Sequence, residues 1–149
     1  MKTIYLLITC LLIQWGVFAQ EGVNFRNLTF NEALAQAKAE KKMVFMDCYT
    51  SWCGPCKALA KDIFTRKDVG DFFNANFINV KYDMEKGVGK DLHKRYKSNI
   101  IGFPTLLLIN KEGNVVHQMA GFQEANVLIA GMKAGMEGKS LFAYKDRYA

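Results

Sequence analysis

The hydrophobic and polar positions after about residue 28 alternate between two patterns. Short apolar runs are typical of buried strands, and longer segments place apolar residues on one face of a helix. The strands are expected at 43–49, 77–82, 105–109 and 115–119, and the helices at 29–40, 53–64 with a second part at 67–75, 90–96 and 124–136. This order predicts an α/β fold whose mixed central sheet, part parallel and part antiparallel, has helices on both faces.

Local signals mark several of the element ends. Thr29 and Glu32 fit a capping box at the start of the first helix. The loop 110–113 contains a glycine, which tolerates the positive φ that tight turns need, and it therefore predicts a C-terminal antiparallel hairpin. Gly138 is expected to end the last helix.

The N-terminus has the pattern of a secretory signal peptide. Lys2 precedes an apolar run, and small residues stand at the end of the segment, so we expect cleavage after Ala19. An uncleaved membrane anchor is the alternative, although Gln14 interrupts a segment at the short end for a span. A lipid-modified Cys10 is disfavoured because the apolar run continues past it. The expected organisation is 1–19 signal peptide, 20–139 domain and 140–149 C-terminal tail, in a protein of the bacterial periplasm or the secreted fraction.

Composition agrees with one globular domain. The chain has 149 residues, of which 50% are hydrophobic and 23% charged, and these fractions exclude disorder of the chain as a whole. The formal charge of +6 comes from lysines and arginines spread along the chain, several of them at expected helix ends. A nucleic-acid partner is not expected, because its binding would need one contiguous basic face.

The string from Trp52 to Lys57 contains two cysteines where a buried strand gives way to a helix. Unpaired N–H groups and the positive end of the helix macrodipole stabilise a thiolate at the first cysteine, and the thiolate is the nucleophile. Pro55 is tolerated in the first turn because its missing N–H would be unpaired there. Cys53 is thus the expected attacking thiol, Cys56 the resolving thiol, and Cys53–Cys56 the redox-active disulfide.

Two cysteines at this spacing also occur in zinc sites, haem-attachment motifs and structural disulfides. A zinc site needs four ligands, but only His93 and His117 are present besides the cysteines, far apart in sequence. Haem attachment needs a histidine where Lys57 stands. A purely structural disulfide across so short a loop would remove little chain entropy. No metal and no cofactor are expected, since the cysteines suffice for two-electron exchange.

On these residues the chain resembles the thioredoxin superfamily, from about residue 41 to 135. The string Trp52-Cys53-Gly54-Pro55-Cys56-Lys57 is identical to that of thioredoxin. The resemblance implies a thioredoxin-like fold in which Trp52, Gly54, Pro55 and Lys57 support the site. It also implies that Pro104 forms a cis-proline loop facing the cysteines, with Thr105 after it. The backbone of Phe103 would then pair with an extended substrate segment.

Asp47, five residues before Trp52, corresponds by resemblance to the family's buried acid, which accepts a proton from Cys56 through a water. A strand-end aspartate bound by backbone N–H groups is the alternative. The family pairs this acid with a lysine of the next strand. Asn79 is aligned there, so Lys81 or Lys57 would have to substitute. Cys48 is left over and is expected in the core.

The residues around the cysteines are most similar to exported members, among them the C-terminal domain of membrane thiol:disulfide interchange reductases. We therefore expect an exported oxidoreductase that reduces protein disulfides. An upstream thiol–disulfide electron donor would then reduce its cysteine pair again. A membrane is a partner only if residues 1–19 are not cleaved. The alternatives are an oxidase or isomerase for secreted proteins, and a redox-inactive module that grips clients through Trp52 and Phe103.

Overall fold

The computed structural model describes residues 21–139; the expected signal peptide with Cys10, and the tail 140–149, lie outside them. The strands are β1 (Met43–Tyr49), β2 (Phe77–Asp83), β3 (Thr105–Ile109) and β4 (Val115–Ala120). The helices are α1 (Phe30–Glu40), α2 (Gly54–Ala58), the π-helical turn η1 (Leu59–Ile63), α3 (Lys67–Asn76), α4 (Gly89–Arg95) and α5 (Ala125–Met136). The predicted order of elements is confirmed.

The four strands form one mixed sheet in the order β2-β1-β3-β4. β1 is parallel to β2 and antiparallel to β3, and β3 and β4 form the predicted antiparallel hairpin. The central strands β1 and β3 are almost entirely buried, which explains their continuous apolar sequences.

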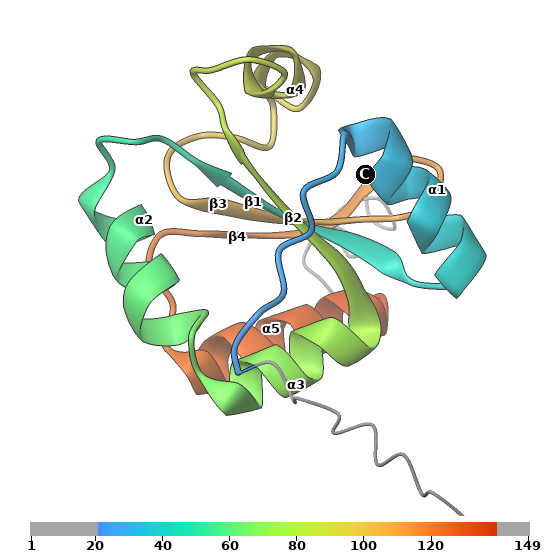
Figure 1. The fold of residues 1–149 in the computed structure, drawn as a ribbon, viewed down its shortest axis with the longest axis vertical. Coiled ribbons are helices and arrows are strands. Elements are labelled where there is room, and N and C mark those ends of the chain that lie inside the picture. The colour runs from blue at the N-terminus through green and yellow to red at the C-terminus, as the bar shows by residue number, and fades with distance from the viewer. Residues whose placement is uncertain (1–20, 140–149) are drawn as a thin grey trace, which may run out of the picture.

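Helices cover both faces of the sheet, as predicted (Figure 1). α1 and α4 pack on the face formed by Val44, Met46 and Cys48 of β1. α2, η1, α3 and α5 pack on the other face, around Phe45 of β1. Because successive side chains of a strand point to opposite faces, Asp47 lies on the same side as Phe45 and α2, while Cys48 lies on the side of α1.

The expected capping box is present at the start of α1. Glu32 N donates to Thr29 Oγ1 at 3.3 Å, and Thr29 N donates to Glu32 Oε2 at 2.8 Å. The expected helix 53–64 differs in detail, because it consists of α2 followed by η1. Such π-helical turns frequently occur at functional sites, and here the turn directly follows the cysteine pair.

Residues 21–28, which we call the N-terminal strap, run along the outer edge of β2 before α1 begins (Figure 1). Val23 N donates to Phe64 O at 2.7 Å, and Arg26 N donates to Asn79 O at 2.8 Å. Gly22 lies so close to Gly70 of α3 that a Cβ on Gly70 would collide with the Gly22 carbonyl. The strap therefore covers the edge of the sheet and is held against α3. None of the helices within residues 21–139 is long and apolar enough to cross a membrane.

Candidate active site

The two cysteines of the Trp52–Lys57 string form a disulfide at the start of α2, with their Cα atoms 5.3 Å apart. Cys53 is the N-cap residue of α2, and its Sγ accepts a hydrogen bond from Cys56 N at 3.2 Å. Gly54 and Pro55 form the exposed first turn of the helix, and Lys57 follows with an exposed side chain. After reduction, the same N–H group would stabilise a thiolate on Cys53.

Next to Cys53 in the chain, the exposed Trp52 packs against a second aromatic ring. Trp52 is 65% exposed, and its ring meets the half-buried ring of Phe103 edge-to-face, with 6.2 Å between the centroids. Trp52 Nε1 donates to Glu85 Oε2 at 2.9 Å, and the ring of His93 packs against Phe103 at 5.7 Å. Sequence reasoning did not find Glu85 or His93, because both reach the site through long-range contacts with no local motif.

The loop before β3 brings the second predicted signature to the same end of the sheet. The Phe103–Pro104 peptide bond is cis, and both Pro104 and Thr105 are buried. Thr105 Oγ1 donates to Gly102 O at 2.7 Å, and Gly121 N donates to Pro104 O at 2.8 Å. These bonds fix the loop on both sides, and Ile101, at its start, is 78% exposed.

Asp47 lies buried beneath the disulfide. It borders a hollow of about 270 Å³ whose wall also includes Cys56, Thr50 and Lys57. Asp47 is 4% exposed, and its Oδ1 has no hydrogen-bond partner within the described residues. Burial raises the pKa of this carboxyl to about 7, against the lowering effect of the Lys81 charge. An acid that titrates near neutral pH, in a space shared with Cys56, is suited to proton transfer.

The lysine opposite the buried acid is Lys81. In the parallel register of β1 and β2, Asp47 is paired with Lys81, whereas Asn79 is paired with Phe45. The prediction that Asn79 occupies the family's lysine position is therefore wrong by two residues, and Lys81 occupies it. Asn79 is instead a buried structural residue, whose Nδ2 donates to Asn74 Oδ1 at 3.1 Å.

Cys48 is a free thiol on the other side of the sheet. It is fully buried and packs in the cluster beneath α1, as predicted. Burial, and the neighbouring Asp47 charge, raise the pKa of this thiol well above its ordinary value. Since the thiolate is the reactive form, Cys48 is unsuited to exchange with the disulfide.

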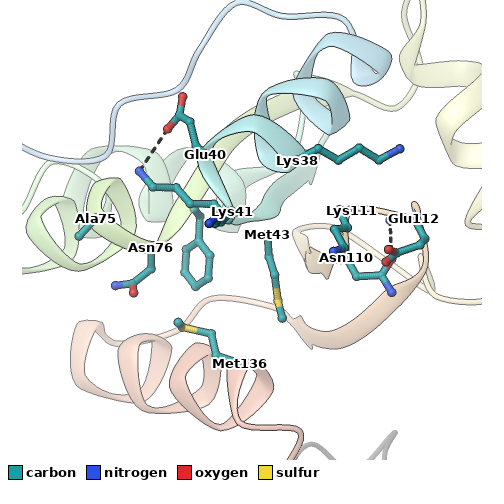
Figure 2. A pocket seen from close by; sticks show the side chains of 12 residues that line it. Lys38, Glu40, Lys41, Met43, Ala75, Asn76, Asn110, Lys111, Glu112 and Met136 are labelled. Carbon is teal, nitrogen blue, oxygen red and sulfur yellow. Dashed lines mark hydrogen bonds and ion pairs between the residues drawn. The ribbon is translucent and has the colours of Figure 1, made fainter.

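A larger hollow of about 750 Å³ lies at the opposite end of β1 (Figure 2). Met43 and Met136 line it, with Lys38, Lys41 and Lys111 among the charged residues around it. No cysteine lines this hollow, whereas Cys56 lines the smaller one beside Asp47. The larger volume therefore does not mark the site of thiol–disulfide exchange. Among residues 21–139, no group of three or more histidine, cysteine or acidic side chains is placed to hold a metal ion.

Comparison with known proteins agrees with this geometry. A family model described as a thioredoxin-like domain matches residues 30–135. The chain belongs to this thioredoxin-like family. A solved structure described as a putative disulphide-isomerase from Bacteroides thetaiotaomicron is 47% identical in sequence, with a TM-score of 0.69. The match covers 78% of this chain and 95% of that protein's chain.

Two curated relatives extend the comparison. A thioredoxin-like protein of Synechocystis is 36% identical over 100 residues, which are 67% of this chain and 85% of that protein. The thiol:disulfide interchange protein DsbD of Vibrio cholerae is 34% identical over 84 residues, which are 56% of this chain but only 14% of DsbD. The thioredoxin-like domain described here thus has the fold and the cysteine pair of a thiol–disulfide oxidoreductase, and spans a small part of its DsbD relatives.

Proposed function

We propose that this thioredoxin-like protein is an exported reductase of protein disulfides that uses Cys53 and Cys56 as its dithiol. The observation that carries the proposal is the setting of the disulfide: Cys53 directly follows the exposed Trp52, whose ring packs on Phe103, and Cys56 borders the hollow that Asp47 also borders. The aromatic pair offers an apolar surface to an unfolded or extended substrate. The buried acid can take up the proton that the exchange releases.

In the first step, the Cys53 thiolate attacks one sulfur of a substrate disulfide. A bond forms between Cys53 Sγ and that sulfur, and the other substrate sulfur leaves as a thiolate. Phe103 and the cis Pro104 lie beside this surface, where the Phe103 backbone would pair with the extended substrate. Trp52, Gly54 and Pro55 shape the exposed approach to Cys53, and Lys57 and Thr105 support it from the helix and the loop.

In the second step, Asp47 accepts the proton of the Cys56 thiol through a water in the shared hollow. The Cys56 thiolate then attacks Cys53 Sγ, re-forms the Cys53–Cys56 disulfide and releases the second substrate thiolate. The substrate has gained two electrons and the enzyme has lost two. An upstream dithiol protein must return the electrons, and the DsbD relatives belong to a group named for such interchange.

Export is supported by the secretory pattern of residues 1–19, and the periplasm is the proposed location. The direction follows from the Gly-Pro spacer that reducing members share, and it depends on the reduction potential of the pair. The test is the equilibrium of the Cys53–Cys56 disulfide in glutathione buffers, with insulin reduction by wild type and Cys53→Ser. We expect a potential near that of reducing thioredoxins and no activity in the variant. Equal activity in the wild type and Cys53→Ser would disprove the proposed reductase activity of Cys53.

A second candidate is isomerisation of disulfides in secreted proteins. It is favoured by the 47% identical relative from Bacteroides thetaiotaomicron, which is described as a putative disulphide-isomerase. An isomerase and a reductase separate in the refolding of scrambled ribonuclease A. Isomerisation needs only Cys53, because another thiol of the client can attack the mixed disulfide and release the Cys53 thiolate. Net reduction also needs Cys56, which releases the reduced substrate. Retention of scrambled-ribonuclease activity in Cys56→Ser, with loss of insulin reduction, would favour the isomerase.

A further inference from the structure

Asp47 borders two hollows. The first, described above, is shared with Cys56. The second, of about 210 Å³, is bordered by Glu21 and Phe25 of the N-terminal strap. Lys81 borders both hollows, and it therefore lies between the hollow shared with Cys56 and the hollow shared with the N-terminal strap.

The ammonium of Lys81 lies over the ring of Phe25, with Nζ 5.1 Å from the centroid. A cation at this distance is attracted by the negative face of an aromatic ring. Among residues 21–139, Lys81 Nζ has no hydrogen bond or ion pair, and the side chain is otherwise exposed. A lysine has four flexible carbons, and without the ring its ammonium would be free to move into water, away from Asp47.

The ring of Phe25 is itself held firmly. It meets Phe64 edge-to-face at 5.1 Å and Phe45 at 6.3 Å, both in the core beneath α2 and α3. The backbone on either side is bound through Val23 N and Arg26 N. The strap therefore presents a fixed aromatic face to the Lys81 ammonium, which makes no hydrogen bond or ion pair with residues 21–139.

We propose that Phe25 is a positioning residue for Lys81: its ring holds the ammonium beside Asp47 and so controls how readily the buried carboxyl takes up the Cys56 proton. The proposal rests on the function proposed above for Asp47. The charged and titratable groups that border the two hollows around Asp47 are Lys81 from β2, Lys57 and Cys56 from α2, Tyr49 from β1 and Glu21 from the strap. Of these, Lys81 places its charge over the Phe25 ring.

The direct test is the titration of Asp47 in the oxidised protein, followed by the carbon-13 shift of its carboxyl between pH 4 and 10. Lys81→Met removes the nearby positive charge and should raise the midpoint. Phe25→Leu should raise it in the same direction by part of that shift, because it releases the positive charge from its position without removing it. Phe25→Tyr keeps a ring and should titrate like the wild type.

The double variant Phe25→Leu/Lys81→Met distinguishes positioning from packing. If Phe25 acts through Lys81, the double variant titrates like Lys81→Met alone. If Phe25→Leu shifts the midpoint equally with and without Lys81, the ring acts by hydration or packing, and the proposal is overturned. No shift in Phe25→Leu overturns it as well.

Phe72→Leu is the matched control. Phe72 is also a half-buried ring packed on the same core, at 5.7 Å from Phe73, whereas the Lys81 ammonium lies over Phe25. It should lower the melting temperature to a similar degree and leave the Asp47 midpoint unchanged. If Phe25→Leu fails to fold, Phe25→Met removes the ring face while it keeps an unbranched apolar side chain in the core.

Activity gives an independent readout. In Phe25→Leu, the pH profile for resolution of the mixed disulfide should move to higher pH by the same amount as the Asp47 midpoint. A wild type that reduces no disulfide would disprove the proposed function, yet the titrations would still decide whether Phe25 positions Lys81. Conversely, an active wild type whose Asp47 midpoint does not respond to Phe25 would disprove only the positioning.

Discussion

Asp47 and Cys56 border the same hollow of about 270 Å³, although they come from different elements, β1 and α2. The space is large enough for water between the carboxyl and the sulfur. Asp47 Oδ1 has no hydrogen-bond partner in the described part of the chain, so the oxygen is free to accept a proton. The buried carboxyl of β1 is therefore placed to exchange a proton with the cysteine of α2.

Asp47→Asn should slow the resolving step. The amide cannot accept the Cys56 proton, and loss of a positioned base typically costs at least about 10²-fold in rate. The measurement is the decay of a mixed disulfide between Cys53 and a model substrate in a stopped-flow instrument at pH 7. Asp62→Asn, an equal charge change at an exposed position of η1, should decay like the wild type. Equal rates in Asp47→Asn and wild type would contradict the role of the acid.

Asp47 should also make stability depend on pH. Its pKa is about 7 in the folded protein against 3.8 ordinarily, so the folded state binds the proton more tightly. The stabilisation is complete below pH 4, falls as the pH rises through 7, and amounts to on the order of 4 kcal/mol. Denaturant unfolding of the oxidised protein, compared between wild type and Asp47→Asn, should show the wild type losing relative stability between pH 4 and 7. A constant difference across that range would mean that the folded pKa is not raised.

His117 should act in the opposite direction. Its ring nitrogens are buried with no partner in residues 21–139, and burial lowers the pKa of the imidazole below 6.5. Because the folded protein holds the neutral ring, its contribution is present above pH 6.5 and is lost as the pH falls through the lowered value. His117→Leu should therefore gain stability relative to the wild type between pH 6.5 and 5. Thermal melts at pH 5 and pH 8 make the comparison.

Gly135 of α5 should not tolerate a side chain. A Cβ there would lie 2.6 Å from the Cβ of His117, and overpacking of this kind costs about 1–3 kcal/mol. Gly54→Ala, another helical glycine but with no atom within 4 Å of the new Cβ, is the control and should keep its stability. His117→Gly removes the Cβ and the ring that the new Cβ would meet, so it should relieve much of the loss in the double variant with Gly135→Ala, as measured by urea unfolding. Additive losses would mean that the two residues are not in contact.

Cys48 should resist alkylation in the native state. It is fully buried and its pKa is raised, so little thiolate is available to react. After reduction and a short treatment with iodoacetamide, mass spectrometry should find Cys53 modified and the Cys48 peptide unmodified until guanidinium is added. Labelling of Cys48 at the rate of Cys53 in the folded protein would contradict its placement beneath α1.

Much of the fold followed from the pattern of residues. The buried strands β1 and β3 are continuous apolar runs, and the capping box at Thr29 marks the first helix. The cysteine pair was also recognisable without a structure, since Cys53 stands between a buried strand and a helix and the chemistry needs only that local position. These features depend on neighbours in the chain, which hydrophobic periodicity and capping report directly.

What only the tertiary structure decided is which residues meet across the fold. Asn79 and Lys81 are two residues apart and lie on the same face of β2, so alternation alone does not tell which one faces Asp47. The register of β1 and β2 selects Lys81. Glu85 beside Trp52 and Phe25 beside Lys81 are likewise brought in by long-range packing, which no local pattern encodes. The sequence thus determined the redox pair, whereas the fold determined the charges and rings around its buried acid.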